Sequence, residues 1–281
     1  MLVELVQTTT ADGVKLHGVL YPAAEPRNDR LDLDAVICLH GVGGNFYSSA
    51  LFDDLATQLQ KVGIAVLRVN TRGHDSVCFV STTSAPQRLG AAFETVGKCV
   101  HDISAWHNLA RDRGMQRIGL VGHSLGAIKS VYAATHDEGL ELHRIVAMSP
   151  PRLSYQAFMN GPRKVRFQQM IEIAQQNVER GEPDALFLAR APFPLLITSA
   201  GYLEKYGPEE NYNLLRFAHR LPCPTLFTYG QLELEGTDVS FVGMPELIDN
   251  LPYHSVVPTC VTIAGADHMY SGRHQQLAEE I

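Results

Sequence analysis

Hydrophobic residues along this chain gather in short runs that alternate with longer segments of helical spacing. The short runs carry apolar residues at successive positions, which is typical of strands buried on both faces. Segment 50–63 instead repeats apolar residues every three or four positions and ends at Gly63, so it predicts a helix closed by a glycine. The runs that predict strands are 35–40, 64–70, 117–123, 144–150, 224–230 and 260–268.

Strands and helices follow one another in alternation through much of the chain. Segments 94–114 and 125–136 have helical spacing and fall between predicted strands. Such alternation predicts an α/β fold with a doubly wound, mostly parallel sheet and helices on both faces. The first residues differ, since 2–8 and 14–21 flank an Ala-Asp-Gly turn and predict an antiparallel hairpin.

The alternation stops between residues 151 and 220. This stretch holds proline, glycine, aromatic residues and short helical pieces such as 163–181, and the strand pattern resumes at 224. We therefore expect one domain spanning 1–281, with 151–220 inserted into it as a small helical cap. The cap should lie over the carboxyl edge of the strands, where doubly wound sheets bind ligands.

Charge and composition exclude several kinds of partner. The net charge is −7 and no long cluster of lysine and arginine appears, so we expect no nucleic-acid partner. No apolar run approaches the length of a membrane span, and the first residues do not have the pattern of a signal peptide. Five cysteines without a CxxC pair fit a reducing compartment, so we expect a cytoplasmic protein without disulfides.

One polar hydroxyl stands out within the small and apolar residues of segment 117–134. Ser124 lies two residues after Gly122 and two before Gly126, between a predicted strand and a predicted helix. A sharp strand-to-helix turn leaves no room for side chains at these two flanking positions and pushes the serine hydroxyl above the sheet. The start of the helix also favours developing negative charge. The pattern predicts a nucleophilic serine.

A serine hydroxyl is a weak nucleophile that needs a base and an acid to orient the base. His268 follows the last predicted strand in the sequence IAGADHMY and is the best candidate for the base. The acid should follow strand 224–230, where the chain offers Glu233, Glu235 and Asp238. Glu233 is favoured by its position three residues after Gly230, and the other two remain open.

A glycine-rich loop supplies donors for an oxyanion. The sequence LHGVGGN at 39–45 follows the first buried strand, and we expect the amides of Val42 and Leu125 to bind the oxyanion, with Gly43 as a second candidate. The loop lacks the spacing of a dinucleotide site, and the chain has no phosphate-binding loop or HExxH motif, so we expect no cofactor and no metal.

Further residues are candidates for substrate contact. Around the serine these are Gly41, Gly43 and His123, and in the cap Phe158 and Tyr202. The cap aromatics fit equally well a role in packing the cap onto the core. For Arg72 and His74, which follow strand 64–70, we favour a structural role in their loop.

Five motifs in order, HGVGGN, NTRGHDS, GHSLG, YGQLE and GADH, resemble the α/β-hydrolase fold superfamily from about residue 10 to the end, apart from the insert. The resemblance implies Ser124 as nucleophile, His268 as base, and Glu233 as acid where the superfamily more often has aspartate. It also implies an oxyanion hole at Val42 and Leu125.

The function that this resemblance implies is hydrolysis of a small-molecule carboxylic ester. We expect the protein to be a monomer or a homodimer. Two alternatives remain open. One is a serine peptidase or thioesterase that uses the same three residues. The other is a non-catalytic relative that binds a ligand or a partner.

Overall fold

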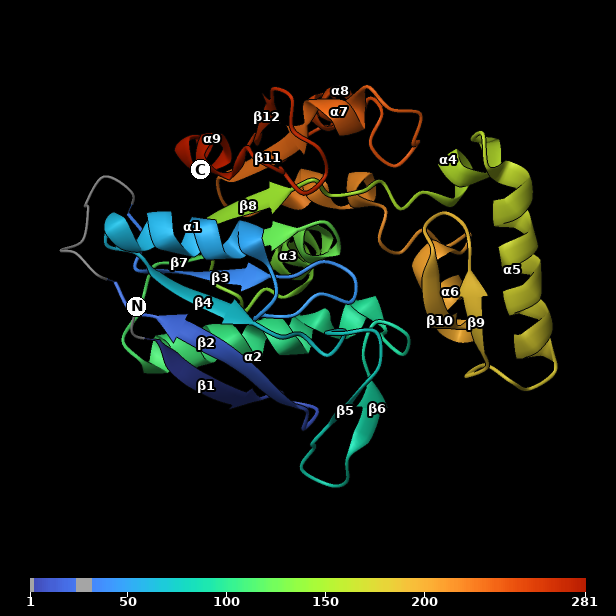
Figure 1. Cartoon of the computed structure of the whole chain (residues 1–281), viewed down its shortest axis with the longest axis horizontal. Helices are drawn as coiled ribbons and strands as arrows, with labels where there is room; N and C mark the ends of the chain where they lie inside the picture. The colour runs from blue at the N-terminus through green and yellow to red at the C-terminus, as the bar shows by residue number, and fades with distance from the viewer. Residues whose placement is uncertain (1–2, 24–31) are drawn as a thin grey trace.

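The computed structural model describes residues 3–23 and 32–281, and an eight-stranded sheet forms the centre of this part of the chain (Figure 1). All neighbouring strands are parallel except the first two pairs, β1–β2 and β2–β4. The predicted doubly wound fold is confirmed. In spatial order the strands are β1 (Glu4–Thr9), β2 (Lys15–Tyr21), β4 (Ala65–Val69), β3 (Ala35–Leu39), β7 (Ile118–His123), β8 (Arg144–Met148), β11 (Thr225–Gly230) and β12 (Thr259–Ile263).

Helices cover both faces of this sheet, which explains why β3 is apolar at every position and β4 at every position except Arg68. In β3, Ile37 packs in a cluster with α2 (Cys99–Asp112), whereas Val36 packs in the cluster that contains α1 (Ala50–Lys61). Figure 1 shows α1 and α2 on opposite sides of the strands. The predicted helix at 125–136 is α3 (Leu125–His136), and α9 (His274–Glu280) packs beside α1.

The predicted hairpin at the start of the chain is present, with Thr9 opposite Lys15. Leu2, the first residue of the predicted strand, lies outside the described residues. The predicted helix 94–114 is shorter, because a 3-10 turn at Val96–Lys98 precedes α2. The sequence analysis also overlooked a small hairpin of β5 (Cys78–Val80) and β6 (Gln87–Leu89).

Residues 151–220 contain both helices and strands, and this differs from the expectation of a purely helical cap. The helices are α4 (Tyr155–Asn160), α5 (Lys164–Glu179) and α6 (Ser199–Tyr206), followed by 3-10 turns at Leu214–Arg216 and Ala218–Arg220. Between α5 and α6, β9 (Leu186–Ala189) pairs with β10 (Leu195–Thr198). The helices α4, α5 and α6 and the hairpin lie together on one side of the molecule (Figure 1), whereas the two 3-10 turns contact α3 of the sheet domain. The boundaries of the cap stay a prediction.

The interior of the cap is continuous with the core of the sheet. Tyr202 and Tyr206 of α6 belong to the same buried cluster as Ile128 of α3 and Phe227 of β11. The segment from 231 to 249 contributes two short helices, α7 (Gln231–Leu234) and α8 (Met244–Asp249), which lie near β11 and β12. The cap is therefore packed directly against the sheet domain and shares its hydrophobic core.

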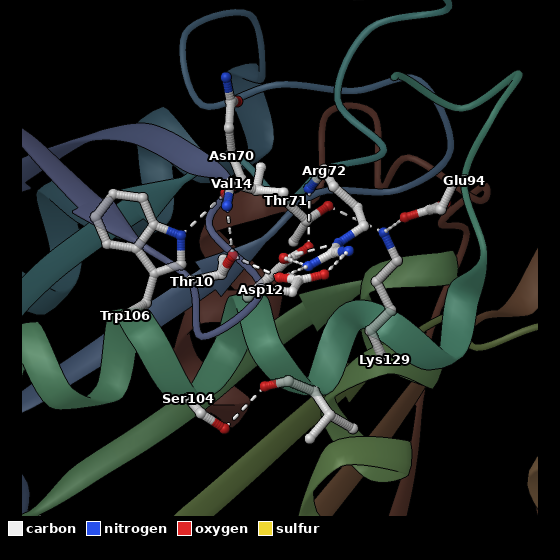
Figure 2. A network of polar contacts seen from close by, with 12 residues as sticks. Thr10, Asp12, Val14, Asn70, Thr71, Arg72, Glu94, Ser104, Trp106 and Lys129 are labelled. Atoms are coloured by element: carbon white, nitrogen blue, oxygen red, sulfur yellow. Dashed lines mark hydrogen bonds and ion pairs between the residues drawn. The ribbon is translucent and has the colours of Figure 1, made fainter. Parts of the chain in front are cut away.

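Arg72 ties three parts of the fold together (Figure 2). Its guanidinium nitrogens Nε and Nη2 lie 2.9 and 2.8 Å from Oδ1 of Asp102, which is fully buried on α2. The other side of the guanidinium binds Asp12, in the turn between β1 and β2, at 2.7 and 2.9 Å. The structural role favoured for Arg72 is confirmed.

Removing Arg72 should destabilise the fold strongly. Arg72→Met leaves the carboxylate of Asp102 buried with the backbone N–H of residue 72 but without its charged partner, and loss of the charge from a buried pair typically costs about 3–5 kcal/mol. Arg113→Met breaks the more exposed pair with Glu4 and should cost less than about 1 kcal/mol. Urea unfolding of the two variants beside the wild type measures both values. Equal losses of stability would show that Arg72 does not anchor these elements.

Candidate active site

Ser124 occupies the sharp turn between β7 and α3. Its backbone has φ 56° and ψ −120°, a left-handed conformation that is uncommon for residues with a side chain. A Cβ atom at Gly122 would overlap the carbonyl of Gly126, and one at Gly126 would overlap the carbonyl of Leu39. The two glycines are therefore required by the close approach of β7, α3 and the end of β3.

Three segments that follow strands bring the predicted nucleophile, base and acid together. Nε2 of His268 lies 3.1 Å from Oγ of Ser124, and Nδ1 of the same ring lies 2.8 Å from Oε2 of Glu233. The three residues follow β7, β12 and β11, so they meet at the carboxyl edge of the parallel sheet. Their hydrogen bonds form an unbroken chain from carboxylate to hydroxyl.

The two alternative acids lie in other interactions. Glu235 accepts a hydrogen bond of 2.7 Å from the amide of Gln231. Asp238 forms an ion pair of 2.7 Å with Arg163. Among the three carboxylates left open by the sequence, the geometry favours Glu233 as the partner of His268.

A buried set of hydroxyls holds Glu233 in place. Oε1 of Glu233 accepts from the backbone N–H of Gly230 at 2.7 Å and from the hydroxyl of Ser149. The hydroxyl of Tyr270 lies 2.8 Å from both Ser149 Oγ and Thr228 Oγ1. These contacts leave one carboxylate oxygen facing the imidazole and fix its direction.

The sequence analysis missed Ser149 and Tyr270. Each has a signal that could have been used, because Ser149 directly follows β8 at the same edge of the sheet and Tyr270 comes two residues after His268. Ser149 also has a positive φ of 48°, a backbone conformation that strand patterns do not reveal.

His123 supports the loop that carries His268. Its Nε2–H donates to the backbone carbonyl of His268 at 2.8 Å, and the two rings lie 4.9 Å apart. Burial, together with the neighbouring His268, lowers the pKa of His123 to about 4. His123 is therefore neutral at physiological pH and positions His268, while part of its surface faces the cavity.

His40 holds the glycine-rich loop in shape. Its Nε2 accepts from the backbone N–H of Thr71 at 3.1 Å, so the ring proton must lie on Nδ1, which donates to the carbonyl of Gly41 at 2.8 Å. Burial and the charge of Lys129 lower the pKa of His40 to about 4. A proton on Nε2 would break the bond to Thr71 and release the loop.

The two predicted oxyanion donors flank Ser124. Gly41 packs so closely that a Cβ there would lie 3.2 Å from Cβ of Ser124, and Val42 is the next residue of that loop. Leu125 is the first residue of α3, so its N–H has no acceptor earlier in the helix. Gly43 has φ 62° and faces the Asp75 backbone, and it does not line the cavity described next.

Ser124 and His268 open into a cavity of about 710 Å³. Its walls come from the sheet edge, the start of α1 and the cap. Among the described residues that line the cavity, the only titratable side chains are histidines and Tyr206. The apolar lining residues include Val42, Leu51, Phe52, Leu125, Pro151, Leu153, Phe193, Pro194, Leu195, Phe241 and Met269.

Two predicted substrate contacts lie elsewhere. Phe158 is buried against the ring of Phe167, and Tyr202 is fully buried with its hydroxyl donating to the carbonyl of Ala191 at 2.6 Å. Neither residue lines the cavity, so this expectation is corrected. Cap aromatics at Phe193 and Tyr206 reach the cavity instead, because they lie at the edge of the cap that faces the sheet.

Among the described residues, no group of three or more His, Cys, Asp or Glu side chains is placed to share a metal ion. In residues 3–23 and 32–281, no helix combines the length and apolar character needed to cross a membrane. All five cysteines are free thiols.

Comparison with known proteins places the chain in a family. The model of the alpha/beta hydrolase family matches residues 36–280. No curated protein matches the sequence.

Solved structures share the fold at low sequence identity. The alpha/beta hydrolase GrgF from Penicillium sp. sh18 has 17% identity and a TM-score of 0.71, covering 100% of this chain and 96% of its own. Est1E from Butyrivibrio proteoclasticus, with ferulic acid bound, has 18% identity and a TM-score of 0.65, covering 98% and 96%. An esterase from Pyrococcus furiosus has 19% identity and a TM-score of 0.63, covering 99% and 87%.

The neutral, buried histidines predict a loss of stability in mild acid. Because the folded protein holds the pKa of His123 near 4, the unfolded chain binds more protons between pH 6.5 and 4. Stability should be fully present above pH 6.5 and should fall by about 1.4 kcal/mol per pH unit per such histidine as the pH drops through this window.

Unfolding measured by urea at several pH values checks this prediction. In His123→Gln, the free energy of unfolding should fall less steeply with decreasing pH than in the wild type. His17→Gln, a change at an exposed position of β2, should leave the wild-type slope unchanged. A slope unchanged by His123→Gln would contradict the lowered pKa of that residue.

Proposed function

The chain belongs to the alpha/beta hydrolase family, and we propose that it is a serine hydrolase that cleaves small, uncharged carboxylic esters. The observation that carries this proposal is the chain of hydrogen bonds from Glu233 through His268 to Ser124, which ends at the wall of an apolar cavity. A carboxylate, an imidazole and a hydroxyl in this order are what acyl transfer to serine requires.

In the proposed mechanism, Nε2 of His268 takes the proton of Ser124 as Oγ attacks the ester carbonyl. Glu233 accepts from Nδ1–H, which keeps the other nitrogen free as a base, and it stabilises the imidazolium that forms. The developing oxyanion binds the amides of Val42 and Leu125. His268 then donates its proton to the departing alcohol, and a water molecule activated by the same ring hydrolyses the acyl-enzyme.

The character of the cavity supports an uncharged ester as substrate. The lining is mostly apolar, and its described residues offer no lysine or arginine to bind a phosphate or carboxylate group. Acyl thioesters of phosphorylated carriers would leave their charge unpaired here. Similarity of fold to an esterase and to a protein with bound ferulic acid supports ester chemistry in general.

Replacing the nucleophile should abolish turnover without unfolding the protein. We expect Ser124→Ala to lower kcat/KM for p-nitrophenyl esters by about 10⁴-fold or more, because the variant lacks the hydroxyl that is hydrogen-bonded to His268. Labelling by a fluorophosphonate should disappear in the same variant, while thermal unfolding stays close to that of the wild type. A folded Ser124→Ala protein that still turns over at the normal rate would refute the proposal.

The acid can be tested against two neighbours. Glu233→Gln should lower kcat by about 10⁴-fold, because the amide stabilises the wrong tautomer of His268. Glu235→Gln and Asp238→Asn serve as matched controls and should keep kcat within about threefold, since their side chains bind Gln231 and Arg163. If one of these controls lost activity and Glu233→Gln did not, the acid would have to be reassigned.

A further inference from the structure

The hairpin of β9 and β10 has one covered face and one exposed face. On the covered face, Phe187 packs against Tyr202 of α6 with ring centroids 5.3 Å apart, and Ala189 and Ile197 are fully buried. On the other face, Leu188 lies directly opposite Leu196, and the two are 57% and 38% exposed. An antiparallel sheet with one face in water normally places polar residues there, so this face is unusually apolar.

The exposed apolar face continues along β9 and has opposite charges at its two ends. Leu186 is 41% exposed and lies on the same side of β9 as Leu188. Asp184 precedes the strand and Arg190 follows it, and both are exposed. Neither side chain forms an ion pair with any residue in the described ranges. The strand thus presents an acid, two leucines and a base, in that order.

This order of groups is complementary to itself. A two-fold axis that runs between two such faces, perpendicular to the strands, reverses the direction of β9 in the second copy. Asp184 of each copy then faces Arg190 of the other, and the leucines of the two copies pack together between these ion pairs. Two identical surfaces can form both ion pairs only if the acid and the base lie at opposite ends of each surface, as they do here.

We propose that the outer face of the β9–β10 hairpin, formed by Leu186, Leu188 and Leu196 with Asp184 and Arg190 at its ends, is a homodimer interface whose partner is a second copy of this chain. A lipid surface is a poorer partner, because it would select basic residues around the leucines and this chain has a net charge of −7. A two-fold pairing buries the three leucines and gives both charged side chains a partner.

The position of the hairpin gives the interface a consequence for the cavity. Phe193, in the turn between β9 and β10, and Leu195, the first residue of β10, form part of the cavity wall. Figure 1 places the hairpin in the cap, away from β1 and α1, and the exposure of its outer leucines leaves that face open to a second copy. Pairing of two hairpins would therefore brace the cap wall of each cavity.

Sedimentation equilibrium measures the association directly. Three leucines and two ion pairs form a small interface, so we expect a dimer that dissociates in the micromolar range, measured from about 1 to 300 µM protein. Leu188→Glu should weaken association by at least about 100-fold, because it buries an unpaired charge. Val257→Glu, at a position 73% exposed outside the hairpin, is the matched control and should dimerise like the wild type.

A charge exchange tests the two-fold arrangement. Asp184→Arg and Arg190→Asp should each weaken the dimer by about 10-fold or more, since like charges then face each other. The double variant should return to within about threefold of the wild type. A monomeric wild type at about 300 µM, a dimer unaffected by Leu188→Glu, or a double variant that is not restored would each overturn the proposal. None of these measurements depends on catalytic activity.

Discussion

The close contact between two glycines and the backbone around them is the constraint on which the site depends. Gly126 lies against the carbonyl of Leu39, and Gly122 lies against Gly126. This approach forces the chain to turn sharply at Ser124, which takes a left-handed backbone conformation. It also brings the end of β3 beside the start of α3, so the loop that begins at His40 lies next to the serine. One steric requirement therefore positions both the hydroxyl and the glycine-rich loop.

Buried hydrogen bonds then hold the acid, the base and the glycine-rich loop in position. Glu233 is fixed by Gly230 and Ser149, and His268 is held through its backbone by His123. His40 holds the backbone of Gly41 in the same way. Both supporting histidines are buried and have lowered pKa values, so they act as neutral hydrogen-bonding groups. The proposed reaction then requires only one histidine, His268, to exchange a proton.

The sequence was most informative where local geometry leaves few choices. Strands buried on both faces need apolar or small residues at most positions, so β3, β4 and β7 could be predicted within one or two residues of their ends. The turn at Ser124 admits only glycine at its flanking positions, and the order of the loops after the last strands pointed to Glu233 and His268. Each of these signals arises within a short segment of chain.

The features that could not be predicted depend on contacts between distant segments. Ser149 and Tyr270 meet because β8 and β12 flank β11 in the sheet, which no local pattern reveals. In the cap, Phe158 and Tyr202 are buried and Phe193 reaches the cavity, although all three are aromatic residues in one insertion. Which side of a short helix or strand faces the substrate is decided by packing against the sheet domain.

The central claim is that Ser124 carries the acyl group during turnover. Rapid mixing of the protein with a p-nitrophenyl ester, acid quenching and mass spectrometry of the digested protein would test it most directly. We expect a peptide containing Ser124 that is heavier by one acyl group, formed as quickly as the first equivalent of p-nitrophenol is released. Hydrolysis of the ester with no acylated peptide, or with the acyl group on a different residue, would contradict it.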